Sequence, residues 1–373
     1  MRYVTRYRIY PDKETENRLF SAFDKCTYVR NWCLDNNTFS DSILPKLKQE
    51  HPELKEVHSK VLQNIAHQIS YNLKGLAKLK EKGRKVGKLR TKRVHSMIYE
   101  QSGFKIFDGM LSLSKIGEMP IVLSRPIRGK IKQIIVKHNK THKWFVSIVS
   151  ETSDTPVKTT GIRCVGIDLN LDNFSTDSDG KVVANPRKLR SSEKRLRRAQ
   201  RKMSKKVKKS KNRKKQRLVL AKSHERVKNQ RDDFLHKWSR YYVDNYDHIV
   251  MEELNIENMV SHNLRGLNKS IYDAGWRRAR YFITYKAESA GKYVYFINPA
   301  YTSQDCFNCG NRVKKTLSDR NHHCQKCGYS VSRDFNASQN ILKRACIGWD
   351  TPELTLAEIE TSTPSQIGAS FSH

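Results

Sequence analysis

The chain has 373 residues, enough for two or three domains with a sizeable buried core. It carries 72 lysines and arginines against 37 aspartates and glutamates, a net charge of +35. So many positive side chains repel one another in a compact fold, which indicates that the protein binds a polyanionic partner. Nucleic acid is favoured as this partner over an anionic membrane surface. The sequence shows no run of 18 apolar residues, no signal-peptide core and no lipidation motif. We therefore expect no membrane association and a cytoplasmic, nucleoid-associated protein.

The first 152 residues change twice between strand and helix patterns. The stretch "RYVTRYRIYP" predicts a strand, and a helix is predicted from about Asp12 because apolar residues then recur at helical spacing. A second helical stripe covers residues 62–76, and a β-hairpin with its turn near 139–141 follows later. These patterns predict a β domain, residues 1–10 and 95–152, that is interrupted by a helical domain, residues 11–94.

A second region begins after a linker predicted at 153–160. The apolar strand "CVGI" leads into Asp168, and the Asp-Gly pair at 179–180 predicts a hairpin turn. Residues 187–231 then hold 22 lysines and arginines and two acidic residues. Thin apolar stripes predict a helical hairpin over 187–246, with the run "KKSKNRKK" at its tip. Its charge indicates phosphate binding, and a merely solvated hairpin is the alternative. The candidate nucleic-acid contacts are Arg197, Arg198, Arg201 and Lys205.

Two C-x2-C pairs, each followed by glycine, predict a metal site. The pairs are Cys306 with Cys309 and Cys324 with Cys327, and 14 residues separate them. Four thiolates suit tetrahedral zinc and leave no open position, so the zinc is expected to be structural. Two disulfides and an iron–sulfur centre are the alternatives. His322 and His323 are surplus as ligands and are expected to face solvent or phosphate. The other cysteines, Cys26, Cys33, Cys164 and Cys346, are expected to be small buried apolar residues.

Three carboxylates stand where a surface charge is unusual. Asp168 and Glu252 each follow a buried strand, and Asp334 opens the helix "FNASQNILKRA". Because a buried uncompensated charge is costly, divalent cations are natural partners, and oxygen ligands select magnesium or manganese. Two such ions can drive phosphodiester chemistry. For Asp334 a helix N-cap is the plainer alternative, and for Asp168 a structural role remains open.

Four motifs in this order resemble the RuvC nuclease domain of the transposon-encoded TnpB proteins, relatives of the type V CRISPR effector nucleases. They are "GIDLNLDNFSTDSDG", "IVMEELNIENM", "YTSQDCFNCG…CQKCG" and "RDFNASQNI". The resemblance implies an α+β multidomain protein with an RNase H-like RuvC core at 161–303 and 329–345. A zinc ribbon at 304–328 is inserted in this core. The resemblance also implies that the N-terminal β domain is a barrel-like wedge domain and that the helical domain is a recognition domain. Together they would recognise a short transposon-adjacent DNA motif.

The same resemblance implies the catalytic residues. Asp168, Glu252 and Asp334 match the three catalytic carboxylates and would hold magnesium or manganese. Glu253 stands where the family often has aspartate, and its neighbour Glu252 is preferred. Asn170 departs from the family, which often has glycine there, although the change removes no ligand.

The implied activity is RNA-guided cleavage of DNA next to a short transposon-adjacent motif. The partners would be a guide RNA from the transposon end and a double-stranded DNA target, bound by a monomer with its RNA. Two alternatives stay open: a transposase that cuts and joins transposon ends, and a guided repressor with an idle metal site. The last 28 residues, 346–373, carry no lysine or arginine and are expected to form a disordered tail.

Overall fold

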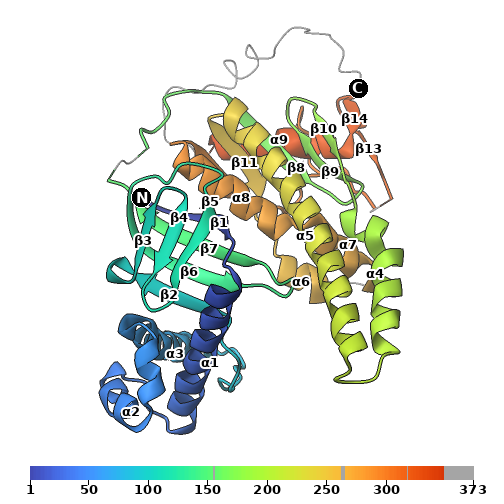
Figure 1. Ribbon diagram of the computed structural model, residues 1–373. Helices are drawn as coiled ribbons and strands as arrows, with labels where there is room; N and C mark the ends of the chain where they lie inside the picture. The colour runs from blue at the N-terminus through green and yellow to red at the C-terminus, as the bar shows by residue number, and fades with distance from the viewer. Residues whose placement is uncertain (154–155, 262–264, 317, 348–373) are drawn as a thin grey trace. The chain divides into compact units, whose positions relative to one another are not determined.

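The structure, a computed structural model, describes residues 1–153, 156–261, 265–316 and 318–347 (Figure 1). The chain forms two compact units that divide between residues 155 and 156, inside the segment predicted to be a linker. In the described part of the chain, no helix combines the length and apolar character needed to cross a bilayer. The predicted tail lies outside the described residues from 348 onward, and residues 346–347 belong to the last helix instead.

The first unit contains a nearly closed, barrel-like sheet of seven strands in the order β2-β6-β7-β1-β5-β4-β3 (Figure 1). All neighbours that pair in this sheet are antiparallel. The strand from the start of the chain pairs with β7 along its whole length, from Arg2 opposite Glu151 to Ile9 opposite Trp144. The strands are β1 (Arg2–Ile9), β2 (Ser96–Glu100), β3 (Phe104–Phe107), β4 (Met110–Leu113), β5 (Gly117–Val122), β6 (Lys130–His138) and β7 (Trp144–Glu151).

Three helices interrupt this sheet between β1 and β2: α1 (Lys13–Asp35), α2 (Leu44–Glu50) and α3 (Ser59–Glu81). The predicted helix start is confirmed, because the Asp12 carboxylate accepts a hydrogen bond from the Thr15 amide at 2.7 Å and caps α1. The buried faces of helices and strands share one hydrophobic core. Cys26 and Cys33 lie in that core, as predicted.

The second unit is built on a five-stranded sheet in the order β10-β9-β8-β11-β12. Strands β8, β11 and β12 run parallel, whereas β9 is antiparallel to β8 and to β10. The predicted Asp179–Gly180 turn joins β9 to β10, and Gly180 has φ +85°, which glycine adopts without strain. The strands are β8 (Cys164–Leu169), β9 (Asn173–Asp177), β10 (Val182–Ala184), β11 (His248–Glu252) and β12 (Tyr293–Ile297).

Helices cover both faces of this sheet, and alternation along the strands decides which residues each face receives. Val165, Ile167 and Met251 share a core with α5 (Lys211–Asn245) and α8 (Trp276–Ser289). On the opposite face, Val250 packs against α9 (Arg333–Ile347), and the half-buried Cys164 and Cys346 join this smaller core. These two cysteines were predicted to be small buried apolar residues; both pack against this core but are only half-buried.

The basic segment forms two helices, α4 (Lys188–Ser204) and α5, that lie side by side as a hairpin (Figure 1). Its tip spans residues 205–210, so the tip prediction is only partly right: the second half of "KKSKNRKK" already belongs to α5. Two helices that the sequence patterns did not predict, α6 (Ile256–Ser261) and α7 (Arg265–Ala274), precede α8. A short hairpin of β13 (Asn321–His323) and β14 (Ser330–Ser332) precedes α9. This hairpin extends past residue 328, the predicted end of the zinc ribbon.

Candidate active site and metal centre

Two of the three candidate carboxylates lie on neighbouring parallel strands. Asp168 is in β8, and Glu252 is the last residue of β11. The register pairs Ile167 with Met251, so Asp168 and Glu252 come next to each other one step along. Because the preceding residues face α5 and α8, both carboxylates point to the face that α9 covers. Asp168 is 9% exposed and Glu252 is half-buried.

The third carboxylate reaches this place because α9 lies directly on β8. A Cβ atom on Gly166 would stand 2.3 Å from the Ser338 carbonyl oxygen and 2.8 Å from the Leu342 nitrogen, so only glycine permits this approach. The N-cap explanation for Asp334 is wrong: the Ser332 hydroxyl accepts the Phe335 amide at 3.2 Å, and Ser332 is the capping residue. Helix capping therefore does not explain why residue 334 is an aspartate.

Asn170 connects the first and third carboxylates. Its Nδ2 donates to Asp334 Oδ2 at 3.0 Å and lies 3.4 Å from Asp168 Oδ2. The two carboxylate oxygens are thus within two hydrogen-bond lengths of each other. The sequence had marked Asn170 only as an unusual residue beside the site, since hydrogen bonding across 164 positions leaves no local signal.

Burial dominates the electrostatics of Asp168 and Glu252, and repulsion from the neighbouring carboxylates adds to it at Asp168. Burial raises the pKa of Asp168 well above its ordinary value, the charges of Glu252 and Asp334 raise it further, and Asn170 and Arg333 oppose the shift. Burial also raises the pKa of Glu252, while the Thr302 hydroxyl and the Arg344 guanidinium oppose it. A cation is the partner that would relieve this repulsion. By contrast, Glu253 is exposed.

The donor chemistry of this site fits magnesium or manganese, which take carboxylate oxygens. In the described part of the chain, the four cysteines are the one group of three or more His, Cys, Asp or Glu residues whose ligand atoms all lie within 4.8 Å of one another. Asp168, Glu252 and Asp334 do not form such a group, so their carboxylate oxygens do not all lie within 4.8 Å of one another.

The cysteine sulphurs match a zinc tetrahedron. Cys306 Sγ lies 3.7 Å from Cys327 Sγ, and Cys309 Sγ lies 3.5 Å from Cys324 Sγ. Sulphurs at about 2.3 Å from a central zinc are about 3.8 Å apart, whereas a disulfide brings them to about 2.0 Å. All eight cysteines are free, so the disulfide alternative finds no support here.

The prediction for His322 is wrong, because this residue is buried, with 0% exposure. Its Nδ1 lies 2.5 Å from Lys315 Nζ, which also donates to the Ser303 carbonyl at 2.7 Å. The alternation of β13 turns His322 inward and leaves His323 exposed, as predicted for the latter.

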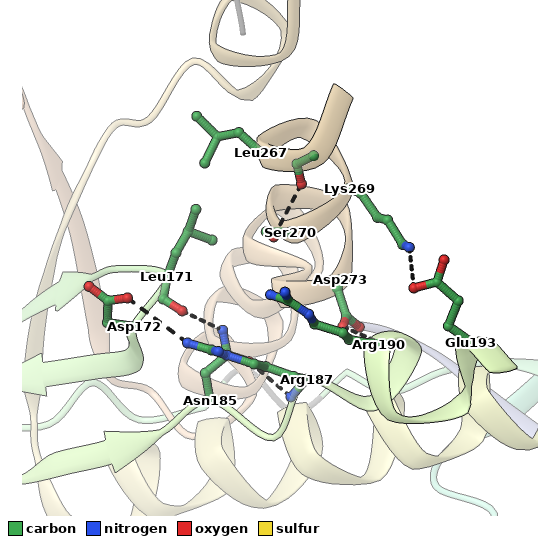
Figure 2. Close-up of a pocket in the computed structure, with 11 residues that line it drawn as sticks. Leu171, Asp172, Asn185, Arg187, Arg190, Glu193, Leu267, Lys269, Ser270 and Asp273 are labelled. Atoms are coloured by element: carbon green, nitrogen blue, oxygen red, sulfur yellow. Dashed lines mark hydrogen bonds and ion pairs between the residues drawn. The ribbon is translucent and has the colours of Figure 1, made fainter. Parts of the chain in front are cut away.

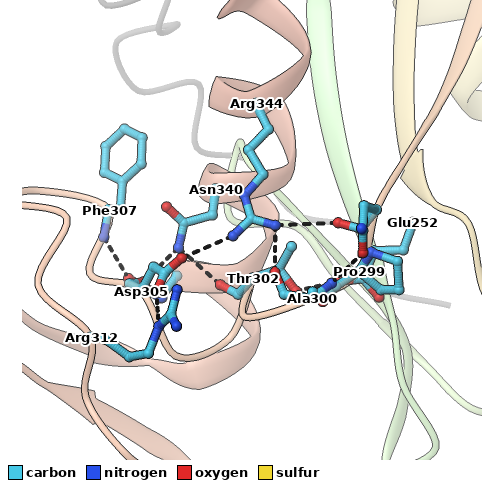
Figure 3. A network of polar contacts seen from close by, with 11 residues as sticks. Glu252, Pro299, Ala300, Thr302, Asp305, Phe307, Arg312, Asn340 and Arg344 are labelled. Atoms are coloured by element: carbon cyan, nitrogen blue, oxygen red, sulfur yellow. Dashed lines mark hydrogen bonds and ion pairs between the residues drawn. The ribbon is translucent and has the colours of Figure 1, made fainter.

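A polar network joins the cysteine centre to the carboxylates (Figure 3). The Thr302 hydroxyl donates to Glu252 Oε1 at 2.5 Å, and Asn340 Nδ2 on α9 donates to the carbonyls of Thr302 and Asp305 at 2.9 and 2.6 Å. Arg344, one turn further along α9, donates to Asp305 Oδ2 at 2.9 Å and to the Ala300 carbonyl at 2.6 Å. The motif "YTSQDCFNCG" carried the signal for Thr302 and Asp305, but their contacts could not be foreseen.

A cavity of about 520 Å³ opens beside the loop that follows Asp168 (Figure 2). Ion pairs between Arg187 and Asp172 and between Lys269 and Glu193 border it. The cavity combines cationic and acidic side chains close to the start of the basic hairpin. It is lined by Leu171, Asp172, Asn185, Arg187, Arg190, Glu193, Gly266, Leu267, Lys269, Ser270 and Asp273.

The four candidate nucleic-acid contacts lie at the C-terminal half and end of α4. Arg197 donates to Glu193 at 2.7 Å, so its charge already has a partner. Arg198, Arg201 and Lys205 are exposed, and Lys205 is the C-cap residue. Nothing in their geometry tests whether they contact nucleic acid, and they stay a prediction.

Known proteins resemble the chain in sequence and in fold. The family described as "Probable transposase" matches residues 147–263, and the family "Cas12f1-like, TNB domain" matches residues 276–341. A protein of Streptomyces pristinaespiralis with the name "Putative RNA-guided DNA endonuclease" is 32% identical over 357 residues, covering 90% of this chain and 88% of the relative. InsQ of Escherichia coli K12, also named an RNA-guided DNA endonuclease, is 36% identical over 258 residues, 65% of this chain and 62% of InsQ.

A solved structure extends the likeness to the fold. The mini-RNA-guided endonuclease CRISPR-Cas_phi3 aligns with a TM-score of 0.56 at 10% identity, covering 93% of this chain and 92% of its own. This identity is too low to carry function, but the first relative covers nearly the whole chain in sequence. The motifs, the cysteine cluster and these matches agree with the resemblance seen in the sequence. The chain belongs to the transposon-encoded TnpB family, whose relatives include the Cas12 effector nucleases.

Proposed function

We propose that this protein is an RNA-guided DNA endonuclease of a mobile element. It hydrolyses DNA phosphodiester bonds next to a short transposon-adjacent motif, with two magnesium or manganese ions held by Asp168, Glu252 and Asp334. The observation that carries the proposal is the convergence of three carboxylates from β8, β11 and α9 on one face of a sheet, where the charges of Glu252 and Asp334 both act on the buried Asp168. The relatives named RNA-guided DNA endonucleases support the same activity.

The second unit is proposed to be an RNase H-like RuvC core. The sheet order β10-β9-β8-β11-β12, with one antiparallel hairpin beside three parallel strands, supports this assignment. The carboxyl ends of parallel strands are where α/β proteins place their sites, and Asp168 and Glu252 lie at those ends. Zinc bound by the four cysteines would hold the ribbon in shape and leave no position for catalysis.

Each carboxylate has a support that fixes its position. The Thr302 hydroxyl holds Glu252, while Asn170 and the Arg333 guanidinium, 3.5 Å from Asp334 Oδ1, hold Asp334. The charges of both Glu252 and Asp334 act on Asp168, which would hold metal together with them. Bound divalent ions activate water and neutralise charge on the scissile phosphate. The ionised carboxylates are the competent form, so protons and metal compete for Asp168 and Glu252.

The basic hairpin, residues 187–246, is proposed to bind the phosphates of the guide RNA or of the RNA–DNA duplex. Its charge supports this role because neutralised phosphates release counterions. The first unit, with its barrel-like wedge and helices, is proposed to recognise the transposon-adjacent motif. Base pairing with a guide RNA from the transposon end would then read the DNA target.

The test is to purify the protein, sequence the RNA that copurifies with it, and measure cleavage of double-stranded DNA carrying the matching target. We expect a discrete RNA ending at the element's boundary and metal-dependent cleavage. Replacing Asp168, Glu252 or Asp334 by alanine should abolish cleavage but not RNA binding. Glu253→Ala, which changes the exposed neighbour, is the matched control and should cleave normally.

Two outcomes would replace the proposal. Processing of transposon ends by RNA-free protein would identify a transposase. Target binding without cleavage, unchanged by Asp168→Ala, would identify a guided repressor. Retained cleavage in all three alanine variants would refute the assignment of the site.

A further inference from the structure

Asn170 lies in the loop between β8 and β9, and the loop fixes the orientation of its amide. The Oδ1 atom of Asn170 accepts the Asn173 backbone N–H at 2.8 Å, which closes the loop on the side chain. The same amide must therefore present its NH2 group on the other side. That side holds Asp168 Oδ2 at 3.4 Å and Asp334 Oδ2 at 3.0 Å.

The NH2 group has two hydrogens and can serve both carboxylates at once. The charge of the half-buried Asp334 repels that of the buried Asp168, and without a cation this repulsion favours their separation. The Asn170 amide opposes the separation, because it donates to a carboxylate of β8 and to a carboxylate of α9 at the same time. The amide uses one oxygen of each carboxylate, Oδ2, and leaves the remaining lone pairs available.

We propose that Asn170 is a positioning residue that assembles the Asp168 and Asp334 carboxylates for divalent metal before the metal arrives. The inference depends on the proposed metal-dependent function. Asn170 stands where the family resemblance leads to glycine, which has no side chain to perform this task. Its action is on the ligands, and it does not touch the substrate. Metal affinity should therefore change more than the rate at saturating metal.

The opposite effect is also physically conceivable. If the amide competed with the metal for the Oδ2 atoms, its removal would strengthen metal binding. The direction of the change in affinity therefore decides between assembly and competition. Partners that orient metal ligands typically contribute about 10- to 100-fold in metal affinity, which sets the expected scale.

The experiment is calorimetric titration of Mn²⁺ into the zinc-loaded full chain. The variants are Asn170→Gly, which removes both the donor and the acceptor, and Asn170→Ser, whose hydroxyl can still accept the Asn173 N–H. Asp168→Ala gives the background of Mn²⁺ bound elsewhere. We expect both Asn170 variants to bind Mn²⁺ about tenfold more weakly than the unchanged protein, with thermal unfolding of the metal-free forms within a few degrees of it.

A cleavage titration provides the second readout. The Mg²⁺ concentration for half-maximal cleavage should rise by a similar factor in both variants, while the rate at saturating Mg²⁺ stays near that of the unchanged protein. Unchanged or tighter Mn²⁺ binding in Asn170→Gly, or normal affinity in Asn170→Ser, would overturn the role of the amide donor. If the unchanged protein binds no more Mn²⁺ than Asp168→Ala, the metal site of the proposed function fails, and the inference fails with it.

Discussion

Replacing Gly166 by alanine tests how the third carboxylate is brought to the site. The added Cβ would lie 2.3 Å from the Ser338 carbonyl oxygen, whereas ordinary contacts begin at 3.4 Å. Helix α9 must therefore move by about 1 Å, because the obstructing atoms are backbone atoms and no rotamer change relieves the contact.

The expected cost has two parts. Overpacking of this kind destabilises a fold by about 1–3 kcal/mol. A displacement of about 1 Å at a catalytic group lowers the rate by about 100-fold. Since Asp334 is near the start of the same helix, Gly166→Ala should weaken metal binding and cleavage more than the loss of stability alone explains.

The assays are urea unfolding, Mn²⁺ titration and single-turnover cleavage under conditions where the variant remains folded. Gly266→Ala is the matched control: Gly266 lies in α7, and among the described residues, chain neighbours and the backbone of its own helix aside, no atom lies within 4 Å of its added Cβ. This control should be neutral or stabilised by up to about 1 kcal/mol, since alanine favours helix. Stability, metal affinity and cleavage all unchanged in Gly166→Ala would refute the direct contact of α9 with β8.

Three further changes have defined outcomes. Asp168→Asn should stabilise the metal-free protein at neutral pH. The pKa of Asp168 is raised in the folded state, so the protonated side chain does not destabilise the fold at low pH, and the fold loses stability as pH rises through that pKa. Asparagine carries no charge and avoids this loss. Urea unfolding should show the gain at neutral pH and its disappearance in acid, and a pH-independent difference would contradict the explanation. Cys324→Ser should lower bound zinc from one equivalent towards none by elemental analysis and expose the ribbon to protease, since the ribbon has little apolar core; full zinc content would contradict the site. Thr302→Val should reduce cleavage about tenfold through Glu252, with Thr302→Ser restoring it, and failure of serine to restore it would exclude the hydroxyl.

Much of the candidate site was visible in the chain because its signals are local. Asp168 and Glu252 each follow a run of apolar residues typical of a buried strand, and a two-residue spacing identifies each cysteine pair. The hairpin turn at Asp179–Gly180 and the cap at Asp12 follow from short-range backbone chemistry in the same way. Such features depend on residues a few positions apart, so the sequence alone determines them.

Tertiary structure decided what connects these pieces. Nothing in the sequence shows that Gly166 must be glycine; the close contact with α9 requires it. In the same way, only the structure shows that the Thr302 hydroxyl donates to Glu252, 50 positions away. Asn170 donates to Asp334 across 164 positions, and His322 is buried although, as a surplus ligand, it was expected to face solvent or phosphate. The sequence by itself determined which carboxylates and thiolates are available. Only the folded chain determined how they are held, because those hydrogen bonds join residues whose distance in the sequence carries no periodic signal.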